Sequence, residues 1–249
     1  MRARTAALLA LASALAAAPA TGAQPDPLTK GRDLYVAGCI SCHGPQLQGV
    51  EPVGPRRAAG SDLPGGPPLR GVGARAADFY LRMGYMPLES AFEAPKRSKP
   101  AYSDGDIRSL VAYIASFGGP GIPMPHAERG ALSEGLALYT EHCAGCHQVV
   151  GEGGVVTNAV APELSNLTPT RIAEAVRVGP YLMPAFPVSQ ISDRELDSII
   201  RYISYTEDPD DRGGWGIAHI GPVTEGLVAW LIAGTALVLV AVVIGARAK

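Results

Sequence analysis

The sequence is poor in cysteine, in aromatic side chains and in net charge. Its 249 residues include four cysteines, 6% are aromatic, and the formal net charge is −2. Few aromatics beside 30 Gly and 22 Pro indicate short helices joined by long irregular loops, not extensive sheet. Residues 24–246 hold 17 basic and 23 acidic side chains. This mild acidity argues against nucleic acid or anionic lipid headgroups as partners.

All four cysteines fall into two copies of one pentapeptide, CISCH at 39–43 and CAGCH at 143–147. Cys-x-x-Cys-His is the attachment pattern of haem c, in which two thiols form thioether bonds and the histidine binds the iron. Two disulfides, or a zinc site of four thiolates, would leave both histidines without a role. The pattern therefore predicts two covalently attached haem c groups. The predicted haem-binding residues are Cys39, Cys42, His43, Cys143, Cys146 and His147.

The N-terminal segment 1–23 has the order of a secretory signal. Arg2 and Arg4 precede the apolar run Ala6–Ala18, and small residues follow. Haem c is attached outside the cytoplasm, so export agrees with the haem motifs. The run is shorter than the roughly 20 apolar residues that span a bilayer. We therefore predict a cleaved signal peptide, with an uncleaved N-terminal anchor as the alternative.

The C-terminal stretch 227–246 contains no charged residue and is closed by Arg247 and Lys249. Its length matches the hydrocarbon core of a bilayer, and Trp230 lies near one end, where interfacial aromatics gather. Basic residues at the end favour a cytoplasmic C-terminus. We predict one transmembrane helix that holds the haem domains on the extracytoplasmic side of the cell membrane.

The two halves of the chain resemble each other well beyond the haem motifs. Gly31–Tyr35 and Gly135–Tyr139 share the pattern Gly-x-x-Leu-Tyr and precede the motifs at the same distance. Ser103 and Ser192 are predicted N-caps of the last helix of each half, followed by an acidic residue in capping-box fashion. The apolar stripes of these two helices coincide. They comprise Ile107, Leu110, Val111 and Ile114 in one copy and Leu196, Ile199, Ile200 and Ile203 in the other.

Between motif and last helix, each half has a Gly- and Pro-rich loop and then a short helical pattern. The loops are expected at 44–68 and 151–162. The short helices are expected at 78–83 and 169–178, the second with Thr168 as N-cap and proline at its first position.

Methionine is the common second axial ligand of haem iron in electron carriers. Met183, followed by proline, is the candidate in the second half. Met83 and Met86 compete in the first half, and Met86 is favoured because Met86-Pro87 aligns with Met183-Pro184. We expect Met83 to be a core residue. Irons bound by His43 and Met86, and by His147 and Met183, would have no open position for substrate, which predicts electron transfer and not catalysis.

These parts, in this order, resemble the dihaem cytochrome c subunit of the actinobacterial cytochrome bcc complex. The resemblance is carried by the motif Cys-x-x-Cys-His-Gly followed by residues 47–50, and by residues 71–73, 86–87, 221–226 and 245–247. It implies a subunit of the proton-translocating quinol–cytochrome c reductase, with menaquinol or ubiquinol as donor. The first haem would accept electrons from the Rieske iron–sulfur subunit. The second would pass them to a haem–copper cytochrome c oxidase, in a supercomplex that also contains cytochrome b.

We therefore predict a mainly α fold of two tandem class I cytochrome c domains plus one C-terminal transmembrane helix. The expected boundaries are signal peptide 1–23, first domain 27–119, linker 120–130, second domain 131–207, juxtamembrane linker 208–226 and membrane helix 227–246. Two other interpretations stay open. One is a dihaem electron-transfer subunit of another membrane oxidase or a dehydrogenase, and the other is a dihaem peroxidase.

Overall fold

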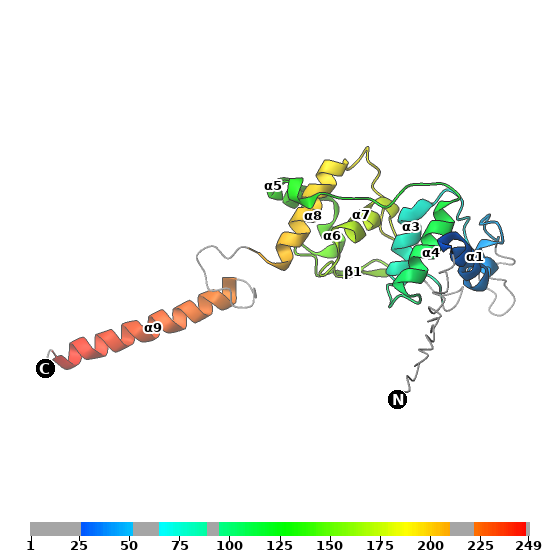
Figure 1. The fold of residues 1–249 in the computed structure, drawn as a ribbon. Helices are drawn as coiled ribbons and strands as arrows, with labels where there is room; N and C mark the ends of the chain where they lie inside the picture. Colours follow the sequence, from blue (N-terminus) through cyan, green and yellow to red (C-terminus); the bar gives the residue numbers. More distant parts are fainter. Residues whose placement is uncertain (1–25, 52–64, 89–94, 210–221, 248–249) are drawn as a thin grey trace, which may run out of the picture.

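The computed structural model describes residues 26–51, 65–88, 95–209 and 222–247. The expected signal peptide 1–23 lies outside the described residues. Two small helical domains lie side by side, and a long helix, α9, stands apart from them (Figure 1). The mainly α fold predicted from the sequence is confirmed.

The first domain contains four helices and the second contains four helices, one 3-10 turn and a hairpin within the described residues. The first domain consists of α1 (Pro27–Gly38), α2 (Ile40–His43), α3 (Gly73–Arg82) and α4 (Asp104–Ala115). The second consists of η1 (Ala127–Arg129), α5 (Leu132–His142), α6 (Ala144–His147), β1 (Gly154–Val156), β2 (Ala159–Ala161), α7 (Pro169–Val178) and α8 (Asp193–Glu207).

The predicted N-caps are confirmed. The side chains of Ser103, Thr168 and Ser192 each accept a hydrogen bond from the backbone amide three residues later. Each cap satisfies one of the amides that the first turn of a helix leaves without a partner. These three residues therefore fix where α4, α7 and α8 begin.

Two elements differ from the sequence expectation. Helix α3 begins at Gly73, five residues before the expected start, and its N-cap Val72 makes no side-chain cap bond. The expected loop 151–162 contains the antiparallel hairpin of β1 and β2, in which Val155 pairs with Val160. The start of α3 was misplaced because no capping side chain marks it, and the hairpin was missed because each of its strands has only three residues.

Each domain is built on a crossing of its first and last long helices, α1 on α4 and α5 on α8. Glycine permits the close approach. A Cβ on Gly31 would lie 2.0 Å from the Ser109 carbonyl oxygen, and one on Gly135 would lie 2.0 Å from that of Ser198. The predicted apolar stripes of α4 and α8 are buried beneath these crossings.

The domains meet where α3 packs against α7 (Figure 1). We call this surface the junction. One part is apolar: Phe79, Met83 and Tyr85 form a buried cluster against Leu167 and Ala175. The other part is ionic and consists of Asp78, Arg171 and Glu174, together with Arg82 at its edge.

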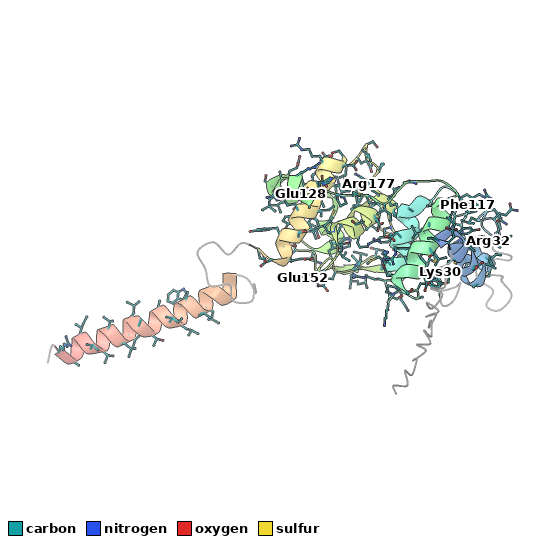
Figure 2. The ribbon with its side chains drawn as sticks, in the orientation of Figure 1. Lys30, Arg32, Phe117, Glu128, Glu152 and Arg177 are labelled. Atoms are coloured by element: carbon teal, nitrogen blue, oxygen red, sulfur yellow. The ribbon has the colours of Figure 1, made fainter. Side chains whose placement is uncertain are left out.

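Helix α9 (Pro222–Arg247) is apolar on all sides. Within Gly226–Arg247, the most apolar 18-residue window has a mean hydropathy of 2.8, and none of it is buried against any other described part of the chain. Apolar side chains point outward along its length (Figure 2). The helix is long and apolar enough to cross a membrane, as the sequence predicts.

Candidate haem sites

The two cysteines and the histidine of each motif are gathered by one helical turn, α2 or α6. The amide of His43 donates to the Cys39 carbonyl at 2.9 Å, and the amide of His147 donates to that of Cys143 at 2.9 Å. Such a turn places the first cysteine and the histidine four residues apart on one face of the helix. The local structure thus directs the thiols and the imidazole of each motif toward one site.

Each motif histidine is oriented by a proline carbonyl from the following loop. Nδ1 of His43 lies 2.8 Å from the Pro67 oxygen, and Nδ1 of His147 lies 2.9 Å from the Pro162 oxygen. A carbonyl only accepts, so Nδ1 carries the proton and donates it, which leaves the lone pair on Nε2. This is the tautomer and the supporting hydrogen bond that a metal-binding histidine requires.

Both imidazoles are nearly buried, with 9% of His43 and 8% of His147 exposed. Burial lowers the pKa of His147, and the hydrogen bond with Pro162 partly opposes that effect. The lowered pKa keeps the imidazole neutral at physiological pH. Only the neutral form can donate its lone pair to iron.

A buried tyrosine braces the chain just after each histidine. The Tyr35 hydroxyl donates to the Gly44 carbonyl at 2.7 Å, and the Tyr139 hydroxyl donates to the Gln148 carbonyl at 2.9 Å. Burial raises the pKa of Tyr35 to about 12, so the phenol stays protonated and remains a donor. The pattern Gly-x-x-Leu-Tyr thus supports the haem motif directly.

The first cysteine of each motif faces the domain core. Cys39 and Cys143 pack against the core clusters of their domains, and burial raises the pKa of each thiol to about 11. Cys42 is half-buried and Cys146 is exposed. The first thiol of each motif thus packs against the core, and in the second motif the other thiol is exposed.

The sequence has five methionines, and the four that the structure describes differ in burial and surroundings. Met1 lies outside the described residues. Met86 borders the core cluster that also contacts Cys39, and Met183 borders the one that also contacts Cys143. Met83 is 8% exposed and belongs to the junction, whereas Met124 is 84% exposed. The structure thus places Met86 and Met183 against the same core cluster as the first cysteine of their motifs, and it keeps Met83 in a core.

Pro67, Pro162 and Arg177 contribute contacts that the sequence does not reveal. The two prolines act through their carbonyl oxygens, which every residue carries. Arg177 is buried and donates to two backbone carbonyls between Met183 and α8. Backbone acceptors leave no residue-type signature, although Arg-x-Gly does recur at Arg82 and Arg177.

Each domain matches its own family model. Residues 28–118 match the family described as "Cytochrome c". Residues 130–203 match "Cytochrome C oxidase, cbb3-type, subunit III". Among solved structures, the reducing HAO-like protein complex of Kuenenia stuttgartiensis covers 71% of this chain and 95% of its own, at 17% identity and a TM-score of 0.35, a likeness too weak to bear on function.

Two similar proteins align with 88% and 89% of this chain. The "Cytochrome bc1 complex cytochrome c subunit" of Corynebacterium diphtheriae is 34% identical over 239 residues, 88% of this chain and 81% of that protein. The protein of the same name from Mycobacterium leprae is 32% identical over 231 residues, 89% of this chain and 76% of that protein. The "4-cresol dehydrogenase [hydroxylating] cytochrome c subunit" of Pseudomonas putida is 36% identical over 76 residues, 30% of this chain and 62% of that protein. Two cytochrome c domains, and similarity to these subunits over 88% and 89% of the chain, show that this chain belongs to the family of cytochrome c subunits of the cytochrome bc1 complex.

Proposed function

We propose that this chain carries electrons, one at a time, through two covalently attached haem c groups as the cytochrome c subunit of a quinol–cytochrome c reductase. Family membership and the two cytochrome c domains support this role. The chain itself is an electron carrier, and the enzyme activity belongs to the whole proton-translocating complex. Haem iron supplies the chemistry by cycling between its ferric and ferrous states.

The first haem would be held by Cys39, Cys42, His43 and Met86. The paired contacts of the two domains carry this proposal. In both, a proline carbonyl fixes the histidine tautomer, and the first cysteine and the methionine border one apolar cluster. Two thiols, a neutral imidazole and a thioether are the donor set of a six-coordinate haem c.

The second haem would be held by Cys143, Cys146, His147 and Met183. With these residues as ligands in both domains, neither iron would be open to substrate, which would separate an electron carrier from a dihaem peroxidase. Reduced protein should therefore bind carbon monoxide poorly. Rapid carbon monoxide binding, or a strong high-spin signal, would favour the peroxidase.

We further propose that α9 anchors the chain and that both domains lie on the extracytoplasmic side. The basic residues Arg247 and Lys249 at the end of the apolar segment support a cytoplasmic C-terminus. In this arrangement 1–23 is the signal peptide. The haem domains occupy 27–119 and 131–207. The linker 120–130 includes η1, which packs on α8, and the juxtamembrane linker 208–226 includes the first residues of α9.

Cytochrome b and the Rieske iron–sulfur protein would be the partners within the complex. The first domain would accept electrons from the Rieske protein, and the second would deliver them to a haem–copper cytochrome c oxidase, in a supercomplex with that enzyme. A dehydrogenase partner is the second candidate, because 76 residues of the chain are similar to a dehydrogenase cytochrome subunit. That similarity covers 30% of this chain, against 88% for the bc1 complex subunit of Corynebacterium diphtheriae.

Purification from native membranes in mild detergent tests this function. Cytochrome b and the Rieske protein should co-purify with the chain, and the oxidase should join them. The intact mass of the chain should include two haem groups. Recovery with a dehydrogenase and without cytochrome b or the Rieske protein would overturn the assignment.

A further inference from the structure

Met183 lies in a turn between α7 and α8 whose two ends are held together. Gly179 has a φ of +62° and approaches Ala185 so closely that a Cβ on the glycine would lie 2.4 Å from the Ala185 nitrogen. The Phe186 amide then donates to the last turn of α7 at 2.8 Å. Residues 180–185, which we call the Met183 turn, are therefore closed at their base.

Arg177 is the side chain that joins this base to the rest of the domain. Its Nη1 donates to the carbonyls of Phe186 and Ile191 at 2.9 and 2.7 Å, and its Nη2 donates to Asp193 at 2.7 Å. The Arg177 side chain is only 4% exposed. A planar guanidinium can make these bonds in several directions at once, whereas an ammonium group is a compact point charge on a flexible stem.

We propose that Arg177 is a positioning residue for the distal ligand of the second haem, because it holds the Met183 turn closed. This inference rests on the proposed ligation by Met183. Without the guanidinium, the carbonyls of Phe186 and Ile191 would lose a charged donor. The turn would then open more often, and the thioether would leave the iron more often.

The first domain offers a matched counterpart. Arg82 also stands two residues before a glycine, and it also pairs with the first residue of the domain's last helix, Asp104. Its remaining described bond, from Nε to Asp78 at 2.8 Å, points into the junction. Asp78 belongs to the body of α3, so Arg82 shares the position of Arg177 but makes no described bond to a carbonyl of the following loop.

The turn that carries Met86 is held by other groups. The Met86 amide donates to the Tyr80 carbonyl at 3.2 Å, and the Ser98 hydroxyl donates to the Gly84 carbonyl at 2.6 Å. Replacing Arg82 should therefore disturb the junction and leave both distal ligands in place. Arg82→Gln is the control for Arg177→Gln.

The experiment uses the membrane-extracted chain with both haems attached. The readouts are the weak red absorption band of Met sulfur on ferric haem, the reduction potential of each haem, and carbon monoxide binding after reduction. Arg177→Gln should weaken the red band, lower the potential of the second haem, and raise its carbon monoxide-binding fraction about tenfold, the effect of losing one charged hydrogen bond. Arg82→Gln should leave all three readouts at wild-type values.

Arg177→Lys separates geometry from charge, and it serves if Arg177→Gln fails to fold. Lysine keeps the positive charge but cannot reproduce all three hydrogen bonds. It should lose the red band at a lower temperature than wild type or Arg82→Lys. Full recovery of band, potential and thermal profile in Arg177→Lys would show that only charge matters, and it would overturn the positioning role.

Met183→Ala distinguishes this inference from the ligation on which it rests. Loss of one red band in Met183→Ala, with an unchanged band in Arg177→Gln, would overturn the role of Arg177 and leave the ligation intact. Unchanged spectra in Met183→Ala would overturn both. The inference is supported if Met183→Ala and Arg177→Gln affect the same haem and Arg82→Gln affects neither.

Discussion

The two domains agree most closely where each surrounds its haem motif. The distance from histidine Nδ1 to a proline carbonyl is 2.8 Å in the first domain and 2.9 Å in the second. The glycine at each helix crossing would bring a Cβ 2.0 Å from a carbonyl oxygen in both. One tyrosine on the first helix of each domain braces the residue after the histidine. The same proposed cofactor in both domains would account for this shared local geometry.

They differ where they meet. Aligning the Arg-x-Gly sequences of α3 and α7 places Phe79 opposite Glu174 in the repeat. Phe79 stacks on Tyr85 with ring centroids 5.8 Å apart, in the apolar part of the junction. Glu174 is fully buried and pairs with Arg171, next to Asp78 from the other domain.

The difference shows that the haem-motif surroundings and the junction surface of each domain are under separate constraints. A helix from one copy packs against the equivalent helix of the other, so the junction needs complementary side chains, not identical ones. The site around each motif needs the same groups in both copies. A substitution should therefore have parallel effects in both domains near the motifs and unequal effects at the junction.

The largest expected effect comes from Met86→Ala. Loss of a thioether ligand should lower the potential of the first haem by on the order of 100 mV and allow carbon monoxide to bind after reduction. Met83→Leu should leave the potentials and spectra of both haems unchanged, because Met83 packs with Phe79 and Tyr85 in the junction. Redox titration followed by absorption measures both variants. A spectral change in Met83→Leu with none in Met86→Ala would exchange their roles.

The features that depend on residue type and spacing could be predicted from the sequence. Ser103 and Ser192 mark the starts of α4 and α8, because a hydroxyl at the N-cap accepts a hydrogen bond from a backbone amide of the first turn. The repeat ranked Met86 above Met83, and the structure places Met83 in a core as expected. That Met86 and Met183 are the ligands stays a prediction.

The features beyond sequence reasoning depend on backbone atoms or on contacts between distant segments. The acceptors of Pro67 and Pro162 are carbonyls, so nothing in the residue type marks them. The junction brings together α3 and α7, which lie about 90 residues apart in the sequence. Periodicity can show that a helix has an apolar side, but not which other helix packs against that side. Burial of Glu174 is therefore visible only in the folded molecule.

Gly31→Ala and Gly135→Ala should each destabilise their own domain by about 3 kcal/mol, because the new methyl would overlap a backbone carbonyl that cannot move freely. Denaturant unfolding followed by helical circular dichroism measures the loss. Gly105→Ala is the control, since its nearest heavy atom would be 3.8 Å away. It should be neutral or stabilising by up to about 1 kcal/mol, the helix preference of alanine. Losses that differ strongly between the two crossings would break the equivalence of the domains.

Glu174→Gln should change how stability depends on pH. Burial raises the pKa of Glu174 from 4.5 to about 8, with Arg171 opposing the rise and Asp78 adding to it. Between these pH values the folded chain keeps a proton that the unfolded chain loses, so stability falls as pH rises. The slope is about 1.4 kcal/mol per pH unit at its steepest.

Denaturant unfolding at a series of pH values from 4 to 9, roughly the window between the two pKa values, measures that slope. Glutamine keeps the shape of the side chain and does not titrate, so Glu174→Gln should flatten the profile. The exposed Glu152 supplies the control, and Glu152→Gln should follow the wild-type curve (Figure 2). Superimposable profiles for wild type and Glu174→Gln would show that folding does not raise the pKa of the buried Glu174 carboxyl.

The smallest expected effect separates the N-caps of α4 and α8. Ser192 has a complete capping box: its hydroxyl accepts from the Glu195 amide at 3.3 Å, and its own amide donates to the Glu195 carboxylate at 2.7 Å. Ser103 accepts from the Asp106 amide at 3.2 Å, but the Asp106 carboxylate is also paired with Lys30 of α1 at 2.6 Å. Either serine replaced by alanine should cost about 1 kcal/mol.

The acidic partners should behave differently from each other. Glu195→Ala should remove only the second half of a cap, whereas Asp106→Ala also removes an ion pair between α1 and α4, which cross beside the first haem motif. Exposed ion pairs contribute about 0.2–1 kcal/mol and are screened by salt. The cost of Asp106→Ala should therefore shrink in high salt, while that of Glu195→Ala should change less. Unfolding of both variants at low and high ionic strength measures this difference, and equal salt dependence would show that the Lys30 pair contributes nothing to the first helix crossing.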